Sequence, residues 1–130
     1  MTQAWLKEVD WELISAINQQ LCAPKNALHR PTSDGHDEAK NLWEQKHQKA
    51  MGLEEAVELC RKCHRLGPFC NYNGNTFVAV IRNTINGIAE INPEEKAIAR
   101  SLAGHLVAGT AQPGEESQFR TLIDRLASRH

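Results

Sequence analysis

The residue types best suited to chemistry gather in the run Cys60-Arg61-Lys62-Cys63-His64, and two further cysteines lie elsewhere in the chain. Thiolate sulfur and imidazole nitrogen are the atoms that bind zinc and iron–sulfur clusters in proteins. Because residues three and four apart share a helix face, Cys60, Cys63 and His64 point the same way if this run is helical. A Gly-Pro break after the run allows Cys70 to fold back towards them. One candidate site for zinc or an iron–sulfur cluster therefore contains Cys60, Cys63, His64, Cys70 and Cys22.

Two other interpretations compete for the same run. The order Cys60-x-x-Cys63-His64 matches the pattern for covalent attachment of c-type haem, which normally takes place after export. In the plainest interpretation, Cys60 is a core residue on the face formed by Leu53 and Val57, and Cys63 is half-exposed. His64 then lies near a helix C-terminus, where positive charge is favoured. The sequence favours this packing interpretation over the metal site and over haem.

An enzyme that uses Cys63 as its nucleophile is a further alternative. Arg61, Lys62 and His64 are neighbours of the kind that lower the pKa of a thiol and increase its reactivity. The position near the end of a helix has the opposite effect, because the partial negative charge there disfavours a thiolate. A cysteine- or metal-dependent enzyme using Cys63 and His64 therefore ranks behind a non-enzymatic protein.

The sequence also holds a candidate binding site for an anionic cofactor at Asn73, Gly74 and Asn75. These residues open a predicted helix, and free backbone amides at a helix N-terminus bind phosphate and other anions. The order of His64, Pro68-Phe69 and Asn73-Gly74-Asn75 faintly resembles the loop of Fic-type nucleotidyl transferases. The spacing differs from that of the family, and Thr76-Phe77 stand where it has its phosphate-binding arginine. The alternative is a plain turn followed by a capped helix.

Hydrophobic spacing predicts five or six helices that position these residues. In residues 3–22 apolar side chains recur at steps of four, which predicts a first helix with this stripe as its core face. The stripe consists of Trp5, Val9, Leu13, Ile17 and Leu21. Trp11 lies off the stripe, so it either packs within the monomer or forms an exposed contact. Residues 23–37 contain prolines and a Ser-Asp-Gly turn signal, which predict a long loop.

The remaining predicted helices contain or flank the candidate sites. A second helix is predicted over residues 37–50, and a third over residues 53–65, which ends where Gly67-Pro68 forbids continuation. Apolar residues at spacings of three and four favour a helix over residues 75–90. Residues 76–81 are also rich in β-branched and aromatic side chains, so a strand is the alternative there. Asn92-Pro93 predicts the start of a helix that runs to Ala108. A last helix carries Phe119, Leu122, Ile123 and Leu126.

Length and composition limit the function of the chain. Its 130 residues, 41% hydrophobic and 24% charged, are typical of one globular domain, so residues 1–130 are predicted to form a single all-α domain. A formal net charge of −1 gives no basic footprint for nucleic acid. The N-terminus meets acidic residues before any long apolar run, so neither a secretory signal nor a membrane-spanning helix is predicted. These features favour a cytoplasmic protein without structural disulfides.

The sequence therefore predicts a small, soluble helical binding or regulatory module whose functional surface spans residues 60–77. A homo-oligomer is expected, because Ala99, Ala103 and Gly104 form a small face that permits close helix approach. Trp11 is a second candidate contact between copies. His105 falls on the apolar side of its helix and is predicted to be a satisfied core histidine. Nucleic acid and membrane are not expected partners.

Overall fold

The computed structural model describes residues 2–128, which form six α-helices. The helices are α1 (Trp11–Cys22), α2 (His36–Lys46), α3 (Leu53–Leu66), α4 (Asn73–Asn86), α5 (Pro93–Ala108) and α6 (Glu115–Ala127). A 3-10 turn, η1 (Ala23–Lys25), follows α1, and two short strands, β1 (Thr2–Gln3) and β2 (Met51–Gly52), pair in antiparallel orientation. The predicted all-α bundle with a long loop after its first helix is confirmed. Within the described residues, no helix combines the length and the apolar character needed to cross a membrane.

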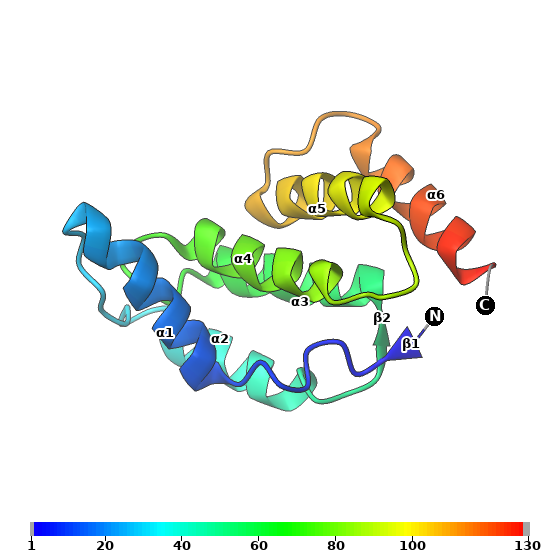
Figure 1. Cartoon of the computed structure of the whole chain (residues 1–130). Coiled ribbons are helices and arrows are strands. Elements are labelled where there is room, and N and C mark those ends of the chain that lie inside the picture. Colours follow the sequence, from blue (N-terminus) through cyan, green and yellow to red (C-terminus); the bar gives the residue numbers. More distant parts are fainter. Residues whose placement is uncertain (1, 129–130) are drawn as a thin grey trace.

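The helices are arranged around a central pair. α3 and α4 pack side by side through the middle of the bundle (Figure 1). α1 packs on α4, and α2 packs on α3. α5 contacts both central helices, and α6 packs against α5. A hydrophobic cluster extends through these contacts, and Trp43, Phe77 and Ile81 are among its fully buried members.

Local signals in the sequence determine where several helices begin and end. The side chain of Asn92 caps α5 by accepting a hydrogen bond from the Glu95 N–H at 2.8 Å. Asp10 caps α1 in the same way, with the Leu13 N–H as donor at 2.9 Å. α3 ends at Gly67, whose φ of 60° is left-handed and suits a residue without Cβ. The third and fifth predicted helices are therefore confirmed nearly residue for residue.

The first helix differs from its prediction. It begins at Trp11 rather than near residue 3, because Asp10 caps it there and the preceding residues form β1 and a turn. Its buried face consists of Trp11, Ile14, Asn18 and Cys22. The stripe predicted as its core face lies beside this face and is partly open, with Leu13 43% exposed and Ile17 and Leu21 half-buried. α1 therefore retains an apolar face that the fold covers only in part.

Trp11 lies inside the molecule, so of its two predicted alternatives packing within the monomer is confirmed and the exposed contact is wrong. Its ring stacks on that of Phe69 with the centroids 5.8 Å apart, and only 6% of the residue is exposed. The hydrophobic spacing does not reveal the burial of Trp11, because it points to the stripe as the buried face of the helix. In the structure, α1 packs on α4 through the adjacent face, which includes Trp11.

Residues 76–81 are helical, so the alternative of a strand is wrong. They lie in α4, whose Thr76, Phe77, Val80, Ile81 and Ile85 are buried at helical spacing. The second and fourth helices end earlier than predicted, at Lys46 and Asn86. In α4 the chain turns at Gly87, whose N–H bonds back to the last turn of the helix.

The small face of α5 is used within the chain. Ala99 and Ala103 are fully buried, and Gly104 is buried as well. A Cβ on Gly104 would come within 2.9 Å of an Arg82 guanidinium nitrogen from α4. Neither this face nor Trp11 therefore supports the predicted homo-oligomer.

Asn18 is a fully buried polar residue that joins three segments of the chain. Its Nδ2 donates to the Asn71 carbonyl oxygen at 2.7 Å and to Thr76 Oγ1 at 3.0 Å. Since the amide nitrogen is the donor, its Oδ1 is the acceptor, and the Nδ1 of His29 lies 2.7 Å from it. Through these hydrogen bonds, Asn18 links α1 to the long loop and to the start of α4.

Candidate functional site

Cys60 and Cys63 lie on the buried face of α3. Neither residue is exposed to solvent, so the prediction that Cys63 is half-exposed is wrong. The Cys63 Sγ donates weakly to the Ala39 carbonyl oxygen at 3.8 Å. Burial raises the pKa of the Cys63 thiol to about 12. Burial and the neighbouring Cys63 also raise the pKa of Cys60 above its usual range. Both groups are therefore thiols at neutral pH, whereas nucleophilic attack and metal binding require thiolates.

The other predicted ligands lie in different surroundings. Cys22 is buried at the end of α1, with its Sγ 3.6 Å from Asn18 Oδ1, and Cys70 is exposed in the loop before α4. Within residues 2–128, no three side chains of His, Cys, Asp or Glu form a group that could hold a metal ion. The buried face of α3 directs its cysteines into the core, so the structure does not assemble the zinc or iron–sulfur set of Cys60, Cys63, His64, Cys70 and Cys22.

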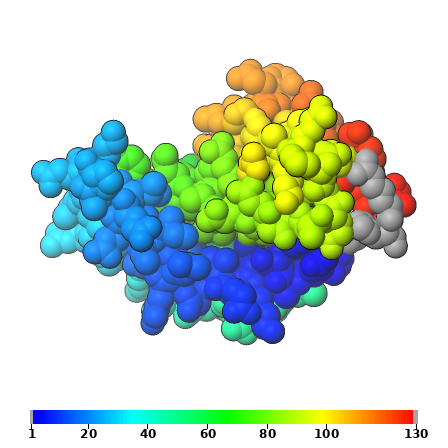
Figure 2. All heavy atoms as spheres, in the orientation of Figure 1, coloured from blue at the N-terminus to red at the C-terminus, as the bar shows by residue number. Residues whose placement is uncertain are grey.

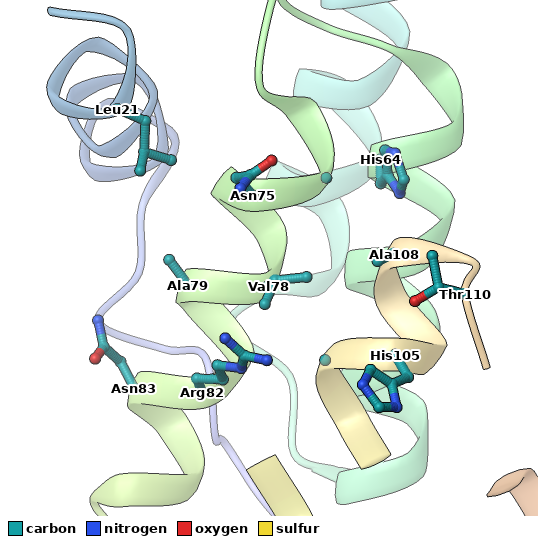
Figure 3. A pocket seen from close by; sticks show the side chains of 12 residues that line it. Leu21, His64, Asn75, Val78, Ala79, Arg82, Asn83, His105, Ala108 and Thr110 are labelled. Atoms are coloured by element: carbon teal, nitrogen blue, oxygen red, sulfur yellow. The ribbon is translucent and has the colours of Figure 1, made fainter. Parts of the chain in front are cut away.

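His64 instead lines an open groove of about 700 Å³ between the ends of α1 and α3 and the facing sides of α4 and α5. We call it the cationic groove; its polar lining consists of His64, Asn75, Arg82, Asn83, His105 and Thr110 (Figure 3). Among the described residues that line it, none is an aspartate or a glutamate. By contrast, the hollow between α3 and α6 places several glutamates beside Arg61 and Arg120. The groove is thus a locally positive site on a chain whose formal net charge is −1.

The imidazole of His64 is fixed by the last turn of α5. Its Nδ1 lies 2.8 Å from the carbonyl oxygen of Val107. A carbonyl oxygen only accepts hydrogen bonds, so Nδ1 carries the proton and Nε2 has a lone pair in the neutral ring. The ring rests against Gly74, where an added Cβ would lie 3.2 Å from Nε2. α5 therefore holds the Nε2 of His64 beside the first turn of α4.

Arg82 is the principal positive charge in the cationic groove. Its side chain extends from α4 towards α5, and its guanidinium group lies over Gly104 (Figure 3). The absence of a Cβ at Gly104 makes this position available, because an added Cβ would be only 3.0 Å from Arg82 Nε. Arg82 forms no hydrogen bond or ion pair with any residue in the described range 2–128. Its five donors are consequently available to a ligand.

His105 is not the core histidine that its helix position predicts. Its side chain is 43% exposed, and its Nδ1 lies 2.9 Å from Glu115 Oε2. The Gln112 N–H donates to Glu115 Oε1 at 2.7 Å. The pKa of Glu115 is lowered chiefly by this backbone hydrogen bond and also by the one from His105. The carboxylate therefore orients the imidazole and leaves its Nε2 available to the groove.

The three residues of the predicted anion site have separate roles. Gly74 and Asn75 line the cationic groove. The Asn73 side chain instead closes the loop before α4, accepting from the Phe69 N–H at 2.9 Å and donating to the Phe69 carbonyl oxygen at 2.7 Å. No side chain caps α4 at Tyr72, so the amides of its first turn have no side-chain acceptor.

Comparisons of this chain with protein-family models, with curated proteins and with solved structures find no match. The groove is accordingly interpreted from its own geometry. Sequence reasoning identified His64 and Asn75 and missed Arg82, Asn83 and Thr110. One signal was present, because Asn75, Arg82 and Asn83 lie on one side of the predicted helix over residues 75–90.

Proposed function

We propose that this chain is a non-enzymatic binding module whose ligand carries an anionic group, such as a phosphate, that binds in the cationic groove. The observation that carries the proposal is the unpaired guanidinium group of Arg82, which lies between α4 and α5 in a groove without carboxylates among its described lining residues. A guanidinium group offers planar, forked donors that match the oxygen atoms of phosphates and carboxylates.

Other groups of the groove suit the same ligand. The amides of Gly74 and Asn75 lie in the first turn of α4, where the helix dipole favours negative charge. The side chains of Asn83 and Thr110 add neutral donors. The free Nε2 of His64 is suited to a protonated oxygen of the ligand, from which it accepts a hydrogen bond.

The proposed site overlaps the predicted functional surface, residues 60–77, only at His64, Gly74 and Asn75. The alternative of an enzyme using Cys63 has less support, because that thiol is fully buried and its pKa is raised to about 12. A nucleophile needs both access to its substrate and a thiolate fraction.

The cytoplasmic location and the homo-oligomer expected from the sequence remain part of this proposal. A reducing, cytoplasmic location agrees with the free thiols of all four cysteines. The predicted homo-oligomer is tested by the molecular mass from light scattering at tens of micromolar protein.

Isothermal titration calorimetry with inorganic phosphate tests the proposed function. Sodium chloride of equal ionic strength is the reference titrant, because a merely ionic effect would appear with both salts. A charge-assisted hydrogen bond contributes about 1.5–3 kcal/mol, so Arg82→Gln is expected to weaken phosphate binding about tenfold or more.

Arg120→Gln is the matched control. Arg120 is 60% exposed and pairs with Glu54 at 3.4 Å, away from the cationic groove, so its loss should leave both folding and phosphate affinity unchanged. Equal phosphate affinity in the wild type and in Arg82→Gln, or the absence of saturable binding to the wild type, would contradict the proposal.

A further inference from the structure

A second hollow, of about 410 Å³, adjoins the cationic groove. It lies between the segment before α1, α1 itself and α4, and we call it the apolar hollow. Its larger apolar lining residues are Trp5, Val9, Leu13, Ile17 and Val80. Asn83 lines both the cationic groove and the apolar hollow, so the two meet at this residue, and we call them together the trough. In Figure 2 the green surface of α4 lies open between α1 in blue and α5 in yellow.

The trough follows the contact between α1 and α4. On α1, Leu21 lines the cationic groove and Leu13 lines the apolar hollow. On α4, Ala79 lines the cationic groove and Thr84 lines the apolar hollow. Both helices therefore pass from one end of the trough to the other. At a rise of 1.5 Å per residue, the stretch from Leu13 to Leu21 extends about 12 Å.

The character of the trough changes along its length. The described residues that line the apolar hollow include no ionisable side chain, whereas Arg82, His64 and His105 line the cationic groove. Leu13 is 43% exposed, although it belongs to a stripe whose helical spacing is typical of a buried face. Apolar surface that repeats in this way next to a charged site is typical of a ligand-binding groove.

We propose that the ligand of this trough is a small amphiphile, with an anionic headgroup in the cationic groove and an unbranched apolar chain along Leu13 and Ile17. This inference rests on the proposed function, because it assigns the chemistry of the remainder of the same ligand. Charge complementarity sets the orientation: the anion lies against Arg82, and the chain passes Asn83 into the apolar hollow. The chain displaces water from the partly exposed apolar face of α1.

A homologous series of inorganic phosphate, butyl phosphate and octyl phosphate tests the inference, with each compound kept below the concentration at which it forms micelles. A fully buried methylene group tightens binding about fourfold, and the trough is open on one side, so about twofold per methylene is expected. Twofold for each methylene group of the octyl chain amounts to about a hundredfold, so octyl phosphate should bind about a hundredfold more tightly than inorganic phosphate. The fluorescence of Trp5 should change with the alkyl phosphates, and Trp5→Phe should remove that change.

Two variants separate the ends of the trough. Leu13→Gln should reduce the gain from the octyl chain several-fold and leave the affinity for inorganic phosphate unchanged. Ile98→Gln is the matched control, because Ile98 is 48% exposed on α5 and lines a different hollow. Both residues are exposed enough that circular dichroism should show an unchanged fold. Arg82→Gln should weaken the binding of every member of the series.

The outcomes distinguish this inference from the function on which it rests. If inorganic phosphate binds and octyl phosphate binds no more tightly, the amphiphile is refuted and the anion site stands. Equal effects of Leu13→Gln and Ile98→Gln on octyl phosphate also refute the amphiphile. If octyl phosphate binds equally well to Arg82→Gln while inorganic phosphate fails to bind, both proposals are refuted.

Discussion

Replacing Gly104 with alanine tests whether the position of Arg82 determines anion binding. An added Cβ would lie 2.9 Å from Arg82 Nη2, 3.0 Å from Nε and 3.2 Å from Cζ. The end of a flexible arginine side chain moves more readily than the backbone of α5, so the guanidinium group should leave its place over the helix. Loss of its hydrogen bond to an anion amounts to about 1.5–3 kcal/mol, which weakens phosphate affinity about tenfold or more.

The same substitution should leave the protein folded. Alanine is favoured over glycine in a helix interior by about 0.5–1 kcal/mol. Displacement of Arg82 breaks no hydrogen bond or ion pair with the rest of the described chain, because this side chain forms none there. The free energy of unfolding of Gly104→Ala should therefore equal or exceed that of the wild type. Weaker binding without weaker folding separates a local effect from general damage.

Calorimetric titration with phosphate and unfolding in urea measure the two effects. Gly52→Ala is the control for a glycine substitution, since its added Cβ meets only Glu55 Oε1, at an ordinary 3.7 Å. It should leave phosphate affinity unchanged. Wild-type phosphate affinity in Gly104→Ala would refute the reasoning that the guanidinium group must lie over Gly104 to bind the anion.

Three further predictions concern folding and reactivity. In Gly35→Ala the new Cβ would lie 1.7 Å from the Leu66 carbonyl oxygen, so unfolding in urea should show a loss of about 2–3 kcal/mol or more, and wild-type stability would contradict the packing of α2 on α3. In the folded protein a thiol reagent should modify Cys70 rapidly and the three buried cysteines only after unfolding, and rapid reaction of more than one thiol would contradict their burial. The pKa of Glu115 is lowered by folding, so the stability that it adds is present above the usual glutamate pKa of about 4.3 and is lost as the pH falls through its folded-state pKa. The difference in unfolding free energy between the wild type and Glu115→Gln should shrink from pH 7 to pH 3, and a constant difference would refute this linkage.

The helices could be predicted where local signals act alone. Asn92 and Pro93 determine the start of α5, and Gly67 with Pro68 determines the end of α3, because caps and breakers depend on neighbouring residues only. The extent of α1 could not be predicted in this way. The stripe through Leu13 continues into residues that precede the cap at Asp10, and only packing against α4 decides which face is buried.

The candidate site illustrates the same limit. The spacing of Cys60 and Cys63 correctly places both on one helix face, but spacing does not reveal whether that face meets solvent or the core. Arg82 and Gly104 lie in different helices, and their close approach depends on how α4 packs on α5. The polar face that Asn75, Arg82 and Asn83 share was visible in the sequence, whereas their proximity to His64 and His105 required the fold.

Mapping of phosphate binding by NMR tests the central proposal most directly. Gly74, Asn75 and Arg82 line the cationic groove, so the backbone N–H signals of the first two and the Nε–H signal of Arg82 should report on an anion bound there. Titration with phosphate at constant ionic strength should shift these signals along one saturable curve, while the Nε–H of Arg120, outside the groove, stays in place. Shifts at Arg120 equal to those at Arg82, or no saturable shift at Gly74 and Asn75, would contradict anion binding in the cationic groove.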